Sequence, residues 1–115
     1  MAEEHLLTKS NLKYLYWTPA QQLTHHTVTG CNLNSGDLLG TGTISGTEKT
    51  EYGSMLELTW GGKEKIQLPS GEERVFLQDG DSIRMTGACH GDGFTIGFGD
   101  CEGTILPALE DSEFW

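Results

Sequence analysis

The sequence has few basic residues, few cysteines and no long apolar run. Lys and Arg together number 7 against 17 Asp and Glu, which gives a formal net charge of −10. This balance disfavours nucleic acid and anionic membrane surfaces as partners, because both attract positive charge. No apolar stretch reaches the length of a membrane span, and the stretch at residues 1–7 carries acids in place of a signal-peptide core. We therefore expect a cytoplasmic protein that binds neither nucleic acid nor a membrane.

The scarcity of cysteine has a consequence of its own. The three thiols, Cys31, Cys89 and Cys101, are an odd number and do not share the spacing of a metal site. Thiols are kept reduced in the cytosol, where disulfides are rare. We predict that all three thiols are free.

Glycine, by contrast, is abundant, with 16 residues in a chain of 115. Glycine at this frequency without a collagen period predicts many turns between short strands. The length suits one small domain or part of a larger one. We predict a mainly β (α+β) chain with a hairpin tip at residues 90–93 and a turn at Gly99-Asp100. Its expected strands lie at residues 12–16, 37–44, 54–60, 65–68, 73–77, 82–86, 94–98 and 103–106.

One helix is predicted near residues 19–28. Thr18 can serve as its N-cap, and Pro19 suits the first helical position because a backbone N–H would be unpaired there anyway. Gln21 falls three residues after the cap, which is the spacing of a capping box. Gly30 can end the helix in a left-handed conformation.

The helix carries two adjacent histidines, His25 and His26. Neighbouring residues on a helix point in different directions, so this pair cannot chelate one metal as an i, i+4 pair can. We expect both side chains to stabilise the C-terminal end of the helix through its dipole and through hydrogen bonds.

A short turn pattern occurs twice. Residues 33–37 and 77–81 share the pattern Leu-x-x-Gly-Asp. Glycine can take positive φ in such a turn, and the Asp carboxylate can accept hydrogen bonds from nearby backbone N–H groups. We predict the same turn at both places, as a reused local device and not as a duplicated domain.

The alternation in residues 54–60 makes this stretch a candidate site segment. It places Glu57 between apolar neighbours on one face of a predicted strand, opposite a core face made by Leu56, Leu58 and Trp60. If the face of Glu57 is solvated, its carboxylate is an ordinary exposed group. If that face lines a cleft, the carboxylate is partly desolvated and suited to chemistry.

A second candidate segment is Gly-Thr-Ile-Ser-Gly at residues 42–46. It places the hydroxyls of Thr43 and Ser45 between glycines. Glycine lets a ligand approach the backbone, and a hydroxyl can donate to a carboxylate or a carbonyl oxygen. The same pattern describes many ordinary turns, so a binding segment and a plain turn both remain open.

Further motifs follow one another along the chain. They are Thr-Pro-Ala-Gln-Gln-Leu-Thr-His-His at residues 18–26, Gly-Thr-Ile-Ser-Gly at 42–46, Met-Leu-Glu-Leu at 55–58, Gly-Asp-Gly at 91–93 and Ile-Gly-Phe-Gly at 96–99. In this order they resemble the fumarylacetoacetase (fumarylacetoacetate hydrolase) family. The resemblance covers about residues 10–109 and only the C-terminal part of the family protein, which is several times longer.

The resemblance implies the C-terminal part of a mixed β-sandwich roll, in a homodimeric enzyme that binds Ca²⁺ or Mg²⁺. The family hydrolyses a carbon–carbon bond of 4-fumarylacetoacetate, a diketo acid, to fumarate and acetoacetate, the last step of tyrosine and phenylalanine catabolism. In that mechanism the metal polarises a diketone oxygen and a histidine acts as general base on water. A glutamate orients the histidine, as the third member of a triad does.

Only two of these roles match positions in this sequence. Glu57 matches the orienting glutamate and is the catalytic candidate, and Thr43 matches a substrate-binding threonine. The resemblance places the metal ligands, the general base and the cationic groups upstream of residue 1, and His25 and His26 match a helix pair and not the base. The chain alone is therefore expected to bind no metal and to be inactive.

The resemblance also sets boundaries and alternatives. It implies a part of a catalytic domain at residues 1–109. The composition of residues 110–115 predicts an acidic tail after it. One alternative is a non-catalytic binding or interaction module derived from the enzyme. Another keeps the family and changes the chemistry, since its relatives include decarboxylases and other diketone hydrolases.

Overall fold

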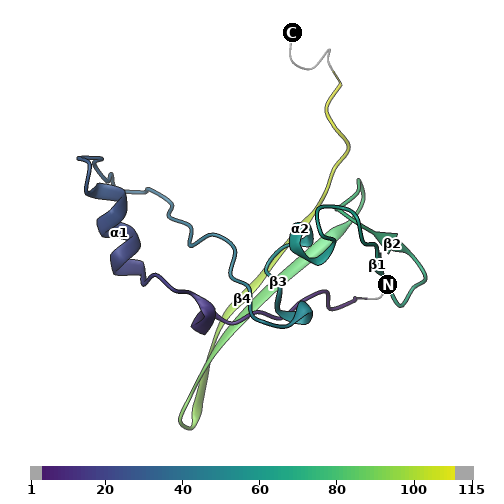
Figure 1. Ribbon diagram of the computed structural model, residues 1–115, viewed down its shortest axis with the longest axis horizontal. Helices are drawn as coiled ribbons and strands as arrows, with labels where there is room; N and C mark the ends of the chain where they lie inside the picture. Colours follow the sequence, from purple (N-terminus) through teal and green to yellow (C-terminus); the bar gives the residue numbers. More distant parts are fainter. Residues whose placement is uncertain (1–3, 111–115) are drawn as a thin grey trace. The chain divides into compact units, whose positions relative to one another are not determined.

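The computed structural model describes residues 4–110 (Figure 1). These residues fall into two compact units. The first unit ends at Phe76, and the second begins at Leu77. Two antiparallel pairs of strands and a few short helices make up the regular structure, so the predicted mainly β (α+β) class is confirmed. Of the acidic tail expected at residues 110–115, all but the first residue lies outside the described part. No helix within residues 4–110 is long and apolar enough to cross a membrane.

The second unit is built on one long hairpin. Strand β3 (Ser82–Gly91) pairs antiparallel with strand β4 (Phe94–Thr104), in a register that runs from Ser82 opposite Thr104 to Gly91 opposite Phe94. A two-residue loop, Asp92-Gly93, joins the strands, and Gly93 has a φ of 76°. The left-handed conformation that such a loop needs explains the glycine. The predicted hairpin tip is therefore confirmed.

Strand β4 corrects two sequence-based predictions. The strand predicted at residues 94–98 and the first two residues of the strand predicted at 103–106 belong to one continuous strand, and the turn predicted at Gly99-Asp100 is wrong. Gly99 does take positive φ, at 75°, but it lies beside a register shift between Thr86 and Ala88. A bulge of this kind absorbs extra residues without ending the ladder.

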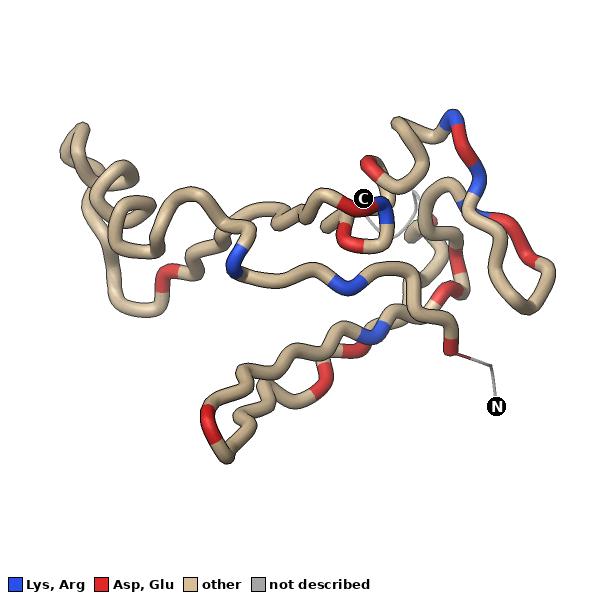
Figure 2. Tube along the Cα trace, turned by 60° about the horizontal axis from the view of Figure 1, so that its bottom comes forward, with Lys and Arg blue, Asp and Glu red and all other residues tan. Residues whose placement is uncertain are grey.

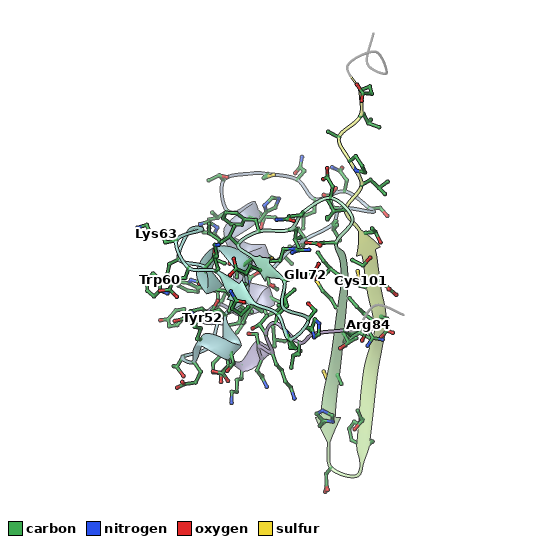
Figure 3. The ribbon with its side chains drawn as sticks, turned by 90° about the vertical axis from the view of Figure 1, so that its right-hand side faces the viewer. Tyr52, Trp60, Lys63, Glu72, Arg84 and Cys101 are labelled. Atoms are coloured by element: carbon green, nitrogen blue, oxygen red, sulfur yellow. The ribbon has the colours of Figure 1, made fainter. Side chains whose placement is uncertain are left out.

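Near its open end, the hairpin carries polar and charged side chains on one face and sulfur-containing side chains on the other. On one face Ser82 and Thr104 lie 2.7 Å apart through their hydroxyls, and Arg84 forms an ion pair with Asp100 at 3.5 Å. The neighbouring pair of Met85 and Cys101 points to the other face, because side chains alternate along a strand. Figure 3 shows Arg84 and Cys101 on the two strands of the hairpin.

Helix α1 (Pro19–Thr27) in the first unit confirms the predicted helix and its cap. The Thr18 hydroxyl accepts a hydrogen bond from the backbone N–H of Gln21 at 3.3 Å, and the Gln21 side chain accepts from the Thr18 backbone N–H at 2.9 Å. Gly30 has a φ of 87° just beyond the helix. The helix carries no Asp, Glu, Lys or Arg, and Figure 2 shows the acidic residues spread along the rest of the chain.

A small sheet near the end of the first unit is shorter than the sequence suggested. Strand β1 (Ile66–Gln67) pairs antiparallel with strand β2 (Glu73–Arg74). The strand predicted at residues 65–68 is thus confirmed only in its two central residues, and the strand predicted at residues 73–77 only in its first two. The connecting turn contains Gly71 with a φ of 90°, and its N–H donates to the carbonyl of Leu68 at 2.9 Å.

Two other predicted strands are absent from the described residues. Residues 37–44 form no ladder, because no described segment offers them a row of backbone partners, and a strand exists only in a sheet. Residues 12–16 contain instead a 3₁₀ turn, Leu12–Tyr14, capped by the side chain of Asn11, which accepts from the N–H of Lys13 at 2.9 Å.

The twice-occurring turn has the same geometry in both places, as predicted. The carboxylate of Asp37 accepts from the backbone N–H of Asn34 at 2.8 Å, and that of Asp81 accepts from the N–H of Gln78 at 2.9 Å. The glycine before each Asp has a φ of 92° and 90°, respectively. Only the second turn leads into a strand.

The strand predicted at residues 54–60 is wrong, and the correction matters for the site. Residues Met55–Leu58 form a short helix, α2, whose N-cap Ser54 accepts from the backbone N–H of Glu57 at 3.3 Å. Trp60 takes the left-handed conformation with a φ of 50°, and its N–H and that of Gly61 bond back to carbonyls of the helix. These two hydrogen bonds form a Schellman cap, which fixes where the helix ends.

The helix also changes which residues are buried. Leu58 is 6% exposed and Thr59 is fully buried, whereas Leu56 and Trp60 are 61% and 60% exposed. The predicted core face of Leu56, Leu58 and Trp60 is therefore correct only for Leu58, because a helical turn sends these three side chains in different directions. Figure 3 shows Trp60 at the outer edge of the unit.

Candidate functional site

Glu57 lies at the third position of helix α2, where its backbone and its side chain have separate partners. The backbone N–H is held by the Ser54 hydroxyl at 3.3 Å. The first turn of a helix favours a negative charge, because its N–H groups and the helix dipole are positive there. The carboxylate is therefore placed by the start of the helix and not by strand alternation.

One oxygen of the Glu57 carboxylate is fixed by residues from outside the helix. Oε2 accepts one hydrogen bond from the Ser45 hydroxyl and a second from the backbone N–H of Gly53 at 3.2 Å. The same Gly53 N–H also reaches Ser45 Oγ at 3.0 Å. No described residue donates to the other oxygen, Oε1, so it is available to a further group.

Glu57 and Thr43 line one pocket of the first unit, with a volume of about 550 Å³. A pocket of this size is typical of small-molecule sites. It combines the two candidate residues, which are 14 positions apart, with aromatic side chains and an amide. Its lining residues are Tyr14, Leu15, Tyr16, Trp17, Gln22, Thr41, Thr43, Ile44, Ser45 and Glu57.

Thr43 is exposed in this pocket, and its hydroxyl has no hydrogen-bond partner within residues 4–110. Its methyl group lies against the backbone of Gly53: a Cβ atom added to Gly53 would stand 2.6 Å from both Thr43 Cγ2 and the carbonyl oxygen of Ile44. Any side chain at Gly53 would therefore displace the segment that carries Thr43. The glycine lets the two candidate segments lie in contact.

A second hydrogen-bonded pair lies next to the pocket. The Tyr14 hydroxyl donates to Glu51 Oε1 at 2.6 Å. This hydrogen bond lowers the pKa of the Glu51 carboxyl and raises the pKa of the Tyr14 hydroxyl above its usual value. The other Glu51 oxygen accepts from the N–H of Glu48 at 3.3 Å. The pair joins the wall of the pocket to the turn at Lys49–Glu51.

Sequence reasoning found Ser45 as a possible donor to a carboxylate, and the structure identifies that carboxylate as Glu57. It missed Gly53 and the aromatic lining of the pocket. A signal for part of this was present: Ser54 and Glu57 have the spacing of a capping box, which indicates a helix start and not a strand.

The histidines of helix α1 lie in its last turn, as predicted, outside this carboxylate network. His26 Nε2 is 3.5 Å from the thiol of Cys31. All three cysteines are free and exposed, in agreement with the predicted thiols. The pair of His26 and Cys31 has no third potential ligand: within residues 4–110 no three His, Cys, Asp or Glu side chains form a group that could hold a metal ion. The residues described here do not fit a Ca²⁺ or Mg²⁺ site on their own.

Comparison with known proteins gives consistent results over nearly the whole chain. A family model described as "Fumarylacetoacetate (FAA) hydrolase C-terminal" matches residues 2–106. The chain is 61% identical over 110 residues to a fumarylacetoacetase of Dictyostelium discoideum and 58% identical over 109 residues to that of Homo sapiens. These alignments cover 94% and 95% of the chain, and each covers 26% of the relative. The chain thus spans about a quarter of the length of these curated relatives.

Proposed function

The chain belongs to the fumarylacetoacetate hydrolase family, and from this membership we propose that it supplies the C-terminal part of a fumarylacetoacetase active site. The reaction is the hydrolysis of 4-fumarylacetoacetate, a small diketo acid, to fumarate and acetoacetate, the last step of tyrosine and phenylalanine catabolism. The observation that supports this most strongly is the common pocket of Thr43 and Glu57, the two residues that the family resemblance assigns to the site.

Glu57 is the positioning carboxylate in this proposal. Its Oε2 is occupied by Ser45 and Gly53, and Oε1 has no donor within the described residues. A histidine from the rest of the enzyme donates its ring N–H to Oε1, which fixes the tautomer and leaves the other ring nitrogen to take a proton from water. The carboxylate also stabilises the imidazolium that this proton transfer creates.

Thr43 holds the substrate. Its hydroxyl lines the same pocket as Glu57 and has no partner among the described residues, so it is available to donate to a carboxylate or carbonyl oxygen of the diketo acid. A site hydroxyl of this kind adds orientation as well as affinity, because hydrogen bonds are directional.

The remaining parts of the site come from sequence beyond this chain. We assign the metal ligands, the general base and the cationic groups to the three quarters of the family protein that the alignments leave uncovered. A Ca²⁺ or Mg²⁺ ion held by those ligands would supply a Lewis acid for the diketone oxygen of the substrate. Residues 1–109 form part of the catalytic domain, and the complete enzyme is a cytoplasmic homodimer.

A chimera tests this proposal directly. In it, this chain replaces the matching segment of the Dictyostelium relative, which shares 61% of its residues. We expect the chimera to hydrolyse 4-fumarylacetoacetate, measured by the loss of substrate absorbance. Glu57→Gln should lower kcat by at least about 100-fold, the usual contribution of a positioned acid–base group, and leave the Tm unchanged.

Glu64→Gln is the matched control. Glu64 is also an exposed carboxylate, but it is paired with Lys49 at 2.8 Å and does not line the pocket. Exposed ion pairs contribute little, so this variant should keep the activity of the parent chimera. If Glu57→Gln turns over substrate like Glu64→Gln, Glu57 is only structural. A folded chimera without activity would instead favour a non-catalytic module.

A further inference from the structure

We propose that Ser45 is a positioning residue that acts through Glu57, by holding one oxygen of its carboxylate so that the other faces the general base. This inference rests on the proposed function and goes beyond it, because it assigns to Ser45 a role that is exerted through Glu57. It follows from three hydrogen bonds among Ser45, Gly53 and Glu57.

The direction of the serine hydroxyl is fixed by its neighbours. Ser45 Oγ accepts from the backbone N–H of Gly53 at 3.0 Å, and a backbone N–H can only donate. An ionised carboxylate can only accept, so the single hydroxyl proton of Ser45 must point at Glu57 Oε2. The Gly53 N–H reaches the same oxygen at 3.2 Å. Oε2 is thus held by two donors from outside the helix.

The hydrogen bonds that hold the start of helix α2 are different from those that hold the Glu57 carboxylate. Helix α2 is capped by Ser54 through the backbone N–H of Glu57, and this bond does not involve Ser45. Loss of the Ser45 hydroxyl leaves the cap intact and removes one of the two hydrogen bonds to Oε2. The backbone then stays in place while the carboxylate gains rotational freedom, which disturbs Oε1 more than it disturbs the fold.

The expected effect is therefore on turnover and not on substrate binding. In the chimera, Ser45→Ala should lower kcat by about 10- to 100-fold, the usual range for a group that orients a functional ligand, with KM close to that of the parent. Ser45→Thr keeps the hydroxyl and should restore most of kcat. The thermal midpoints of all three proteins should agree closely.

A double-mutant cycle distinguishes a role through Glu57 from a general structural role. In a Glu57→Ala background the Ser45 hydroxyl has no carboxylate to hold, so adding Ser45→Ala should change kcat little. An equal loss of kcat in both backgrounds would show that Ser45 supports the fold independently. Parental kcat in Ser45→Ala would likewise overturn the proposal, even if Glu57→Gln had confirmed the proposed function.

Crystal structures of the parent chimera and of Ser45→Ala give a readout that does not depend on activity. We expect the Glu57 carboxylate to leave its position in the variant, with helix α2 unchanged. A carboxylate that keeps its position without the hydroxyl would overturn the inference. This comparison decides the role of Ser45 even if the chimera fails to turn over substrate, a result that would count against the proposed function alone.

Discussion

At the scale of single residues, the site depends on two side chains that each have a polar atom without a hydrogen-bond partner among the described residues. Glu57 has one oxygen fixed and one without a donor, and the Thr43 hydroxyl has no partner within the described residues. Both side chains are exposed, so water can satisfy these polar atoms at little cost, and the missing protein partners alone do not distinguish a site from a turn. The pocket that the two residues share is the observation that favours a site.

Two substitutions of Thr43 distinguish the effect of its hydroxyl from the effect of its side-chain shape. Thr43→Val in the chimera keeps the branched side chain that contacts Gly53 and removes the donor. We expect KM for 4-fumarylacetoacetate to rise about tenfold, the equivalent of one hydrogen bond, with a smaller effect on kcat. Thr43→Ser keeps the hydroxyl and serves as the control. Equal KM values for the valine and serine variants would exclude substrate binding by the hydroxyl.

At the scale of elements, the short helix α2 shows what local sequence could and could not predict. The alternation of Leu56, Glu57 and Leu58 favoured a strand, whereas the Ser54 cap and the positive φ of Trp60 produce one helical turn. The capping-box spacing was visible in the sequence. The left-handed tryptophan was not, because such a conformation is unusual for any residue other than glycine and a few polar ones.

Other elements also divide into those that local sequence signals predict and those that depend on contacts between distant segments. Helix α1 was predictable because its cap, its proline and its terminal glycine are all local signals. The bulge in β4 was not, because it depends on the register with β3, and register is a property of two strands. The hydrogen bonds of Ser45 and Gly53 to the Glu57 carboxylate bring together residues from separate segments. The sequence could therefore suggest Ser45 and Glu57 as site residues but could not predict that they are in contact.

The Tyr14–Glu51 hydrogen bond gives a prediction for pH dependence at this scale. The pKa of Glu51 is lowered from its usual 4.5, so its contribution to stability is present above pH 4.5 and is lost as pH falls through the lower folded value. The pKa of Tyr14 is raised from 10.0, so its contribution is present below pH 10.0 and is lost as pH rises through the higher folded value.

Tyr14→Phe in the chimera removes this hydrogen bond and little else. We expect the Tm of the variant to lie below that of the parent across the neutral range, with a difference that narrows at both the acidic and the alkaline end. Thermal melts from pH 3 to pH 11 would measure it. A Tm difference that does not vary with pH would show that the ionisation of Glu51 is not coupled to the Tyr14 hydroxyl.

At the scale of the whole molecule, the described residues bury little apolar surface. Leu58 is the only apolar side chain that is buried within residues 4–110. Along the hairpin, Phe94, Ile96 and Phe98 are 60%, 56% and 75% exposed. Folded domains at this length normally bury about two thirds of the surface of the unfolded chain. The exposed apolar side chains therefore support a role as part of a larger domain.

The isolated chain should accordingly behave as an incomplete domain. We expect it to bind the dye ANS strongly and to elute from size exclusion as aggregates, because exposed apolar patches and open sheet edges promote association. The chimera, with the same residues covered, should bind little dye and elute as a single species. A monomeric isolated chain with a sharp thermal transition would favour an independent binding module.

The most direct test of the central claim is the distance from Glu57 Oε1 to its nearest partner in a crystal structure of the active chimera. If Glu57 orients the general base, a histidine nitrogen from the remainder of the enzyme should lie within about 3.2 Å of Oε1, with Ser45 and Gly53 still bound to Oε2. An Oε1 that faces bulk solvent, or that is paired with a lysine or an arginine, would contradict this account of the site.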